Sequence, residues 1–415
     1  MNKMTPQIRF QGFTDDWEER KLGELASFSK GNGYTKNDLV EFGDPIILYG
    51  RLYTKYETVI EKVDTFVNKK DKSIISEGSE VIVPASGESS EDISRASVVG
   101  KSGIILGGDL NIIKPVNYID SIFLALTISN GSQQKEMSKR AQGKSVVHLH
   151  NSDLKQVNIL YPKLEEQQKI GSFFKQLDNT IALHQRMLDL LKEQKKGFLQ
   201  KMFPKNGAKV PELRFSGFDD DWEERKLIDI AGNISDGDWI EANHIFDTGD
   251  YRIVQTGNIG IGSFLDKLQN AKYFYQADFD ELKANEIFPG DILISRLSDP
   301  AGRTSILPDL GVRAVTAVDV AIIRPNDNFH AEFLVAELNS STILAKVDSL
   351  ASGSTRKRIS RKNLEGVQIT LPTFEEQQKI GSFFKQLDDT IALHQRKLDL
   401  LKEQKKGFLQ KMFVS

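Results

Sequence analysis

The chain of 415 residues is too long for one ordinary hydrophobic core, so it predicts two domains with connecting segments. It has no cysteine, which excludes disulfide bonds, thiolate chemistry and cysteine-based zinc sites. The formal net charge of -3 gives no overall attraction to nucleic acid, so any surface that binds it must be local. The first residues lack a signal-peptide core and the apolar runs are short of a membrane span, so we expect a cytoplasmic protein.

The first half opens with an aromatic and acidic segment, RFQGFTDDWEERKL, at residues 9–22. Alternating and continuous apolar runs then predict several strands and one helix. We expect strands over residues 45–49, 80–84, 96–106 and 110–115, an amphipathic helix over 122–139 and a last strand over 157–160.

One long helix is predicted next, over residues 164–203, and we call it a rod. Glu165 and Glu166 lie in its first turn and lysines gather at its far end, as the helix dipole favours. Its apolar residues follow a heptad pattern. At 1.5 Å per residue the rod is roughly 60 Å long. Because one small domain cannot bury so long a stripe, we expect a second rod to pack against it.

The second half repeats this order with other residues between the same markers. RFSGFDDDWEERKL stands at residues 214–227, and we call it and residues 9–22 the lead segments. The expected strands cover residues 252–255, 291–295, 304–307, 319–324 and 367–371, with a helix over 331–350. A second rod at 374–413 repeats the first, with only Leu164/Phe374, Asn179/Asp389 and Met187/Lys397 different.

The whole chain is therefore a tandem duplication. We predict an α+β fold: two mixed α/β domains joined by two long antiparallel coiled-coil helices with pseudo-twofold symmetry. The expected divisions are domain 1 at residues 1–163, spacer helix 1 at 164–203, domain 2 at 204–373 and spacer helix 2 at 374–415.

A histidine stands at the middle of each rod where the heptad pattern expects leucine. If the rods run antiparallel about a twofold axis, His184 faces His394, and this buried polar pair fixes their register. The alternative is that each histidine is solvated or makes a single hydrogen bond.

Each lead segment carries three aromatic residues with two possible roles. They are Phe10, Phe13 and Trp17 in the first and Phe215, Phe218 and Trp222 in the second. They could form a docking patch, or they could fix the start of each domain to its neighbouring rod. We favour the second interpretation.

Catalytic patterns are weak. The Gly-Lys-Ser runs at residues 100–102 and 143–145 lack the earlier glycine of a phosphate-binding loop, and Gly257, Gly260 and Gly262 have the wrong spacing for a dinucleotide site. The chain has no Pro-Pro, which removes the usual amino-methyltransferase signature. The six histidines show no metal-ligand spacing, and we expect His148 and His150 to alternate rather than converge. We therefore predict a non-enzyme with no metal or cofactor of its own.

Local nucleic-acid binding has better support. The run SGSTRKRISRK contains closely spaced side chains that bond phosphates and base edges: Thr355, Arg356, Lys357, Arg358, Ser360, Arg361 and Lys362. The matching segment of the first half offers Lys144, Ser145, His148 and His150. One further loop pair aligns Ser86-Gly87, with Arg95, against Ser295-Arg296, with Arg303. Another aligns Tyr49-Gly50-Arg51 against Gln255-Thr256-Gly257-Asn258. The alternative is a solvated charged face.

Two variable domains, each followed by a nearly identical long helix, resemble the specificity subunit of type I restriction-modification systems, commonly called HsdS. The resemblance covers the whole chain. It is carried by EEQQKIGSFF at Glu165 and Glu375, by the rods, by the lead segments and by the pattern from Gly353 to Leu364. In the corresponding run from Gly143 to Leu154 the threonine is replaced by valine and the basic residues are fewer.

This resemblance implies a function. Each variable domain would be a target recognition domain that reads one half of a split, asymmetric DNA sequence. The rods would set the spacing and dock two modification subunits, which supply S-adenosylmethionine and adenine N6 methylation, and restriction subunits would join from outside.

Three classes of function compete on the sequence: a DNA-reading subunit without activity, a self-contained enzyme, and a coiled-coil adaptor for proteins. The missing catalytic signatures oppose the enzyme. An adaptor predicts indifference to DNA, whereas a DNA reader predicts binding that weakens with salt. We prefer the DNA reader, with a methylase-only system as a variant of it.

Overall fold

The computed structural model describes residues 5–414 apart from 91, 144–145, 206, 298 and 354–356. It contains two compact units, Met1–Gln185 with Arg396–Ser415, and Arg186–Gln395. Each unit holds one variable domain and the adjoining ends of both rods. The units divide the rods themselves, whereas the predicted boundaries at residues 163, 203 and 373 stay a prediction.

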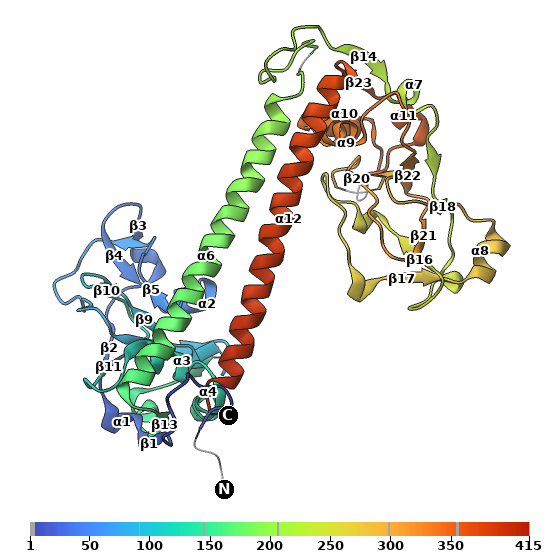
Figure 1. The fold of residues 1–415 in the computed structure, drawn as a ribbon. Coiled ribbons are helices and arrows are strands. Elements are labelled where there is room, and N and C mark those ends of the chain that lie inside the picture. The colour runs from blue at the N-terminus through green and yellow to red at the C-terminus, as the bar shows by residue number, and fades with distance from the viewer. Residues whose placement is uncertain are drawn as a thin grey trace. The chain divides into compact units, whose positions relative to one another are not determined.

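Both rods are continuous helices of 38 residues, α6 (Leu164–Lys201) and α12 (Phe374–Lys411), as predicted (Figure 1). In the first unit Phe173, near the start of α6, packs edge-on against Phe408, near the end of α12, with ring centroids 5.1 Å apart. In the second unit Phe198 and Phe383 make the same contact at 5.0 Å. Within each unit the two helices therefore run antiparallel.

The first variable domain consists of short strands in mixed sheets and several short helices. A five-stranded sheet has the order β2-β11-β7-β9-β5, and a four-stranded sheet has the order β10-β4-β6-β3. The bounds are β1 (Glu18–Lys21), α1 (Leu22–Leu25), β2 (Ala26–Lys30), β3 (Leu39–Val40), β4 (Asp44–Ile47), α2 (Arg51–Thr54), β5 (Val59–Ile60), β6 (Phe66–Val67), β7 (Val81–Pro84), β8 (Ser86–Gly87), β9 (Ser97–Val99), β10 (Ile105–Leu106), β11 (Leu110–Pro115), α3 (Ser121–Ile128), α4 (Gly131–Arg140), β12 (Val147–His148), α5 (Asn151–Leu154) and β13 (Asn158–Tyr161).

The second variable domain has two four-stranded sheets, β15-β22-β19-β20 and β17-β16-β21-β18. Only the β16–β21 pair within them is parallel. The bounds are β14 (Glu223–Lys226), α7 (Leu227–Ala231), β15 (Ser235–Asp236), β16 (Tyr251–Val254), β17 (Lys272–Phe274), α8 (Gln276–Leu282), β18 (Glu286–Ile287), β19 (Ile292–Ser295), β20 (Thr304–Ile306), β21 (Arg313–Thr316), β22 (Val320–Ile323), α9 (Ala331–Leu338), α10 (Ser341–Leu350), α11 (Arg361–Glu365) and β23 (Gln368–Leu371). The mixed sheets and helices confirm the α+β prediction.

Three predicted elements are wrong in the same way, because each is interrupted. The strand over residues 96–106 is two strands, β9 and β10, separated by a turn in which Gly103 has φ +85°. The helix over 122–139 breaks at Ser129, whose hydroxyl accepts a hydrogen bond from Ala96 N (2.8 Å). The helix over 331–350 breaks at Asn339, whose side chain bonds both backbone groups of Thr304. At each helix break a polar side chain ties the helix to a strand or its edge.

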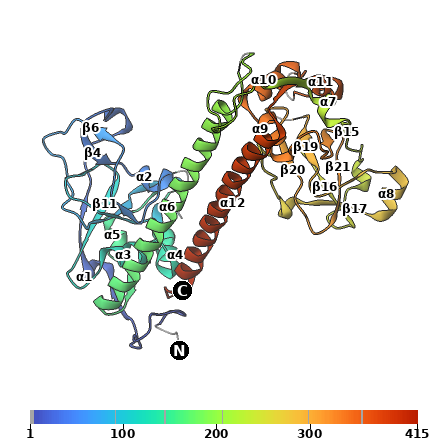
Figure 2. The ribbon, with the colours of Figure 1, turned by 45° about the horizontal axis from the view of Figure 1, so that its top comes forward.

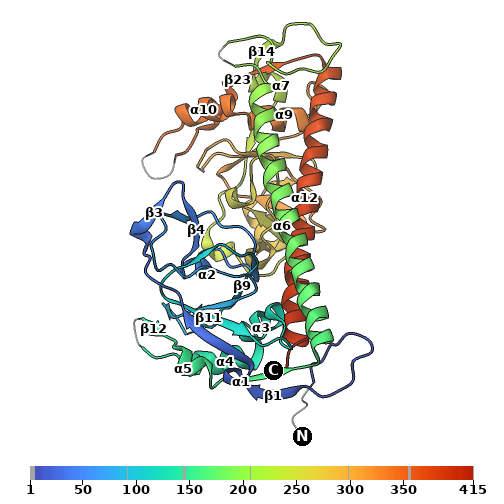
Figure 3. The ribbon, with the colours of Figure 1, turned by 90° about the vertical axis from the view of Figure 1, so that its left-hand side faces the viewer.

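The aromatic residues of the lead segments lie against the rods and against one helix of each variable domain, α3 in the first and α9 in the second. Trp17 packs on Phe123 of α3 and Trp222 on Phe333 of α9, with ring centroids 5.6 and 5.8 Å apart. Phe10 contacts Phe173 of α6. Figure 3 shows α3 beside the start of α6, and Figure 2 shows α9 beside the start of α12. The preferred interpretation is confirmed for Phe10 and for Phe215, which contacts Phe383 of α12. The two tryptophans instead hold the lead segment to a helix of the variable domain.

A buried ion pair repeats this attachment in both units. Arg9 donates two hydrogen bonds to Glu166, at 2.7 and 2.8 Å, and Arg214 donates two to Glu376, both at 2.8 Å. Such two-point pairs fix direction as well as distance. The acidic first turn of each rod therefore binds a domain, in addition to complementing the helix dipole.

The rod ends complete each hydrophobic core. Phe413 is buried and packs on Phe123 and Phe174 in the first unit. Phe203 is its counterpart in the second unit, where it packs on Phe333 and Phe384. The last residues of the chain thus belong to the core of its first domain.

The two rod histidines are half-buried, His184 in the first unit and His394 in the second. Each has interactions within the described structure. Their mutual pairing stays a prediction.

We expect Phe413→Ala to lower the free energy of unfolding of the first unit by about 3–5 kcal/mol, because it opens a cavity in that core. Phe203→Ala should weaken the second unit alone by a similar amount. Hydrogen exchange followed by mass spectrometry would locate each loss. Leu183→Ala is the control, because Leu183 of α6 is 62% exposed, and it should change stability by less than about 0.5 kcal/mol. Equal effects of Phe413→Ala and Leu183→Ala would contradict the closing role of Phe413.

Candidate nucleic-acid interface

The basic run of the second domain lies beside the end of β19. Arg358 pairs with Leu297 through an isolated antiparallel bridge, and Ile359 N donates to Arg296 O (3.0 Å). Ser360 caps α11 by accepting a hydrogen bond from Asn363 N (3.1 Å). The part of the run from Arg358 to Ser360 is therefore held in place by hydrogen bonds, with the Arg358 side chain attached to this fixed backbone.

Arg296 forms the base of this site rather than its surface. It is 4% exposed, it donates to Val318 O at 2.6 Å, and its Nη2 lies 3.1 Å from Asp236 Oδ1. Burial lowers the pKa of the Arg296 guanidinium, and the nearby Asp236 carboxylate opposes this shift. Arg296 thus serves to position the loop around it, and a direct DNA contact by this residue stays a prediction.

Arg358 and Arg361 reach solvent above Arg296. Their side chains are 47% and 50% exposed. Arg358 Nε lies 2.8 Å from Asp319 Oδ1, and Arg361 lies between Asp236 (3.7 Å) and Glu365 (3.3 Å). With Ser360 and Lys362 they line an open hollow of about 700 Å³. Half-exposed guanidinium groups over carboxylates can exchange those partners for phosphate or base oxygens.

The remaining residues of the run are partly described. Lys357 pairs with Asp348 at 2.6 Å. Thr355 and Arg356, and likewise Lys144 and Ser145 of the first domain, lie outside the described residues.

The first domain presents the same backbone site with different side chains. β12 pairs with β8, so that His148 lies opposite Ser86, and Leu149 N donates to Ala85 O (3.0 Å). In the second domain the corresponding hydrogen bond runs from Ile359 N to Arg296 O. Ala85 is therefore the counterpart of Arg296, and His148, which precedes Leu149, is the counterpart of Arg358. The sequence alignment of Ser86 with Ser295 is wrong by two residues. Ser86 pairs with His148 and Leu297 pairs with Arg358, so Leu297 is the counterpart of Ser86. The backbone hydrogen bonds instead match Arg296 with the buried Ala85, in keeping with its inward side chain.

His148 and His150 lie side by side, contrary to the expectation that they alternate. Their rings are nearly parallel, at 3°, with centroids 6.4 Å apart, and both residues are exposed. Residues two apart along an extended chain share a face, which explains the arrangement. Ser86 Oγ lies 3.2 Å from His148 Nδ1. These three residues form a polar surface at the position that the arginines occupy in the second domain.

Other predicted contacts are engaged in holding their own loops. Arg51 binds Asp64 (2.6 Å) and Glu57 (2.8 Å), and Arg95 pairs with Asp92 (2.9 Å). The buried Asn258 accepts a hydrogen bond from Gln255 N and donates to Leu265 O, both at 2.9 Å.

The last three predicted contacts are half-buried. Tyr49 packs edge-on against Tyr53, Thr256 begins a 3-10 helix, Thr256–Asn258, and Arg303 has a buried Nε without a hydrogen-bond partner among the described residues. The DNA contacts assigned to these residues and to those of the preceding paragraph stay predictions.

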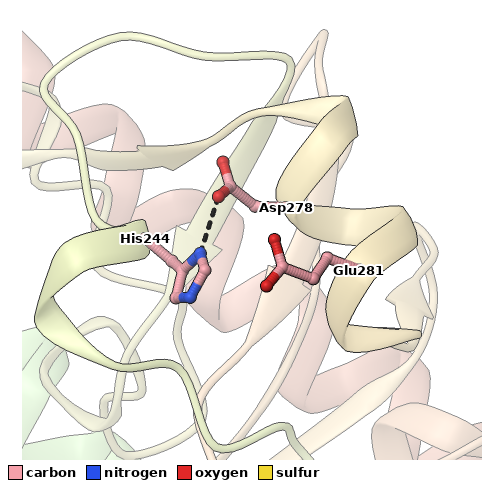
Figure 4. A group of neighbouring side chains, drawn as sticks. All are labelled: His244, Asp278 and Glu281. Atoms are coloured by element: carbon pink, nitrogen blue, oxygen red, sulfur yellow. Dashed lines mark hydrogen bonds and ion pairs between the residues drawn. The ribbon is translucent and has the colours of Figure 1, made fainter.

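One side-chain cluster escaped the sequence search for metal ligands. His244, Asp278 and Glu281 bring ligand atoms within 4.8 Å of one another (Figure 4). His244 Nδ1 lies 2.6 Å from Asp278 Oδ1, and its Nε2 lies 3.1 Å from the Asn243 amide. Because both ring nitrogens are engaged, we interpret the cluster as a hydrogen-bonded group that fixes α8 to the 3-10 helix Ala242–His244. Sequence spacing missed it because 34 residues separate His244 from Asp278.

No helix in the described part of the chain is long and apolar enough to cross a membrane.

Comparison with known proteins places these observations in a family. The model of the type I restriction modification DNA specificity domain matches twice, at residues 14–193 and 219–403. A type I restriction enzyme MjaVIII specificity subunit of Methanocaldococcus jannaschii is 22% identical over 95% of this chain and 91% of its own length. A putative MjaX specificity subunit of the same organism is 24% identical over 95% of this chain and 92% of its own.

Solved structures agree in fold. The S subunit of a type I restriction-modification system from M. genitalium superposes with a TM-score of 0.66 at 15% identity, over 99% of this chain and all of that one. A second chain, from a study of type I complex assembly and conformational transition, gives a TM-score of 0.52 at 18% identity, over 96% of this chain and 98% of that one. With both halves matched by the family model, this chain belongs to the type I restriction modification DNA specificity domain family and carries that domain twice.

Proposed function

We propose that this specificity subunit reads a bipartite, asymmetric DNA site, with one half bound by each variable domain. The observation that carries the proposal is the shared backbone site at which His148 of one domain corresponds to Arg358 of the other. A shared backbone arrangement with unlike exposed side chains is suited to reading two different half-sites. Arginine pairs with guanine O6 and N7, whereas histidine and serine bond other edges and phosphates.

The rods fulfil the second part of the proposed function. They set the spacing between the half-sites and dock two modification subunits, one for each repeat of the chain. A helix of 38 residues spans roughly 57 Å at 1.5 Å per residue, which exceeds the ~34 Å between half-sites one turn apart. The modification subunits would supply S-adenosylmethionine and methylate adenine N6, and restriction subunits would complete the nuclease form. The chain itself would be non-catalytic and act in the cytoplasm.

Exchange of residues 204–373 for the second variable domain of another family member should change only one half of the methylated sequence. Each domain sits on its own rod ends with its own core, so the other domain keeps its fold and its reading face. Sequencing that maps methylated adenines in cells carrying the parent and the hybrid would measure this. A change in both halves would contradict independent reading, and unaltered methylation would favour a protein adaptor without a DNA-reading role.

If Arg358 reads a base, Arg358→Ala should weaken DNA binding by about 1–3 kcal/mol. The protein is tested in complex with modification subunits, and the DNA carries the sequence found by mapping methylated adenines. The assay is DNA binding at several salt concentrations, because a lost phosphate contact also reduces the salt dependence by about one ion. Arg225→Ala is the matched control, because Arg225 is an exposed arginine that pairs with Glu223 on β14 and is not among the residues that line the hollow. Equal affinities for the two variants would reject the assignment.

Arg296→Met should act on stability rather than on sequence preference. Removal of Arg296 takes the nearer cationic partner from the partly buried Asp236, which keeps only Arg361 at 3.7 Å, at a cost of about 1–3 kcal/mol. Urea unfolding should therefore show a less stable second unit, while Arg358→Ala shifts stability by less than about 0.5 kcal/mol. A folded Arg296→Met protein that methylates a different sequence would show that Arg296 reads DNA.

A further inference from the structure

The three tryptophans of the chain are of two kinds. Trp17 and Trp222 occupy matching positions in the two lead segments, and each is 3% exposed. Trp239 follows β15 in the second variable domain and is 72% exposed. Single exposed apolar side chains are common on protein surfaces, so exposure alone gives Trp239 no role. The residues on either side of it distinguish it.

The backbone on both sides of Trp239 is anchored. Before it, Asp238 N donates to Thr316 O (2.8 Å), and the Asp238 carboxylate accepts hydrogen bonds from the backbone N–H and the side-chain amide of Asn285 (2.7 and 2.9 Å). After it, Ile240 packs against a buried hydrophobic cluster. The exposed ring is therefore attached to a segment that is already ordered, so a partner that covers it loses little free energy to ordering the chain.

The same segment begins at the hollow lined by Arg358 and Arg361. Asp236, three residues before Trp239, lines that hollow and lies 3.7 Å from Arg361. Three residues of extended chain span about 10 Å at most. A DNA major groove is about 12 Å wide, so DNA bound by these arginines extends far enough to contact Trp239.

A close approach between two backbones holds the segment at this edge of the hollow. Gly237 lies against the turn between β21 and β22, where a Cβ atom would clash with the carbonyl oxygen of Ala317. The next residues of that turn are Val318, which lines the hollow, and Asp319, which pairs with an exposed arginine. The segment before Trp239 and the residues that hold the arginines therefore belong to one hydrogen-bonded structure.

The first variable domain has this backbone arrangement without the aromatic side chain. Asn32 N donates to Leu106 O (3.1 Å), which is the counterpart of the bond from Asp238 N in the second domain. The next residue is Gly33, with φ +69°, at the position of Trp239. The scaffold thus needs no large side chain here, and Trp239 is a feature of the second domain alone.

We propose that Trp239 is a DNA contact of the second half-site, in which its indole ring covers apolar sugar or base surface next to the groups bound by Arg358 and Arg361. The proposal rests on the DNA-reading function proposed above. The arginines attract the duplex by charge, whereas a tryptophan ring contributes a large apolar area with few rotatable bonds. Deoxyribose and the thymine methyl group offer surface of that kind beside the phosphates and base edges.

Hydroxyl-radical footprinting followed by mass spectrometry tests this contact, because it measures the oxidation of each tryptophan separately. The sample is the full chain in complex with modification subunits, and the probe is a duplex that carries the sequence found by mapping methylated adenines. We expect Trp239 to be oxidised rapidly without the duplex and several-fold more slowly with it. Trp17 and Trp222 are the buried controls and should be oxidised slowly in both states.

Trp239→Ala provides a second readout in the same complex. It should weaken binding of the duplex roughly tenfold, as is usual for the loss of one aromatic contact with a base. The slope of affinity against salt concentration should stay unchanged, because no phosphate contact is lost. Trp239→Phe keeps an aromatic ring and should retain most of the affinity. Leu213→Ala is the matched control, because Leu213 is an exposed apolar residue of the same unit on the linker after α6.

The proposal is overturned if the duplex binds but leaves the oxidation of Trp239 unchanged, or if Trp239→Ala and Leu213→Ala bind DNA equally. Protection of Trp239 by the modification subunits without DNA would also overturn it and would make this residue a protein contact. In these outcomes a loss of affinity in Arg358→Ala still supports the DNA-reading function. A parent complex that does not bind the duplex would reject both.

Discussion

The structure depends on aromatic contacts between the start of one long helix and the end of the other. In each unit this contact brings a phenylalanine of α6 against one of α12, and a further phenylalanine just beyond a rod end enters the domain core. A domain without both rod ends lacks part of its own core. This explains why each unit contains segments of both rods, and why the lead segment, the first helix of each pair and the rods share one hydrophobic cluster.

The same closing contacts are made over very different distances along the chain. Ile8 N donates to Lys411 O (2.9 Å) in the first unit, and Leu213 N donates to Lys201 O (2.8 Å) in the second. The second contact spans a short linker, whereas the first joins residues about 400 positions apart in the sequence. Contacts between distant residues form slowly, because a long loop must close before they contribute. The first unit therefore completes its core only after Met412 and Phe413 have been made, although its variable domain precedes the second one in the sequence.

The duplicated sequence made most of this fold predictable. The heptad pattern predicted both rods, and apolar runs such as residues 110–115 predicted the central strands with bounds close to those observed. Two-residue strands such as β8 and β12 could not be predicted from the sequence, because their pairing is decided by contacts between distant segments. The helix breaks at Ser129 and Asn339 were missed for a related reason: each polar side chain bonds a strand or its edge that is remote in sequence. Residue types at the candidate site were predictable, but the inward direction of Arg296 was not, since a small error of alignment turns a strand residue to the other face.

The exposed arginines of the second domain pair with carboxylates, and these pairs must separate before the arginines can bind DNA in the proposed function. Asp236 lies between the buried Arg296 and the exposed Arg361, at 3.1 and 3.7 Å. When Arg361 turns to a phosphate, Arg296 continues to neutralise Asp236, so no carboxylate is stranded in a buried position. Asp319, the partner of Arg358, is a quarter exposed and can regain water when Arg358 leaves. In the proposed function the buried arginine thus keeps the outer guanidinium groups available to DNA at little electrostatic cost, even though it never leaves the core.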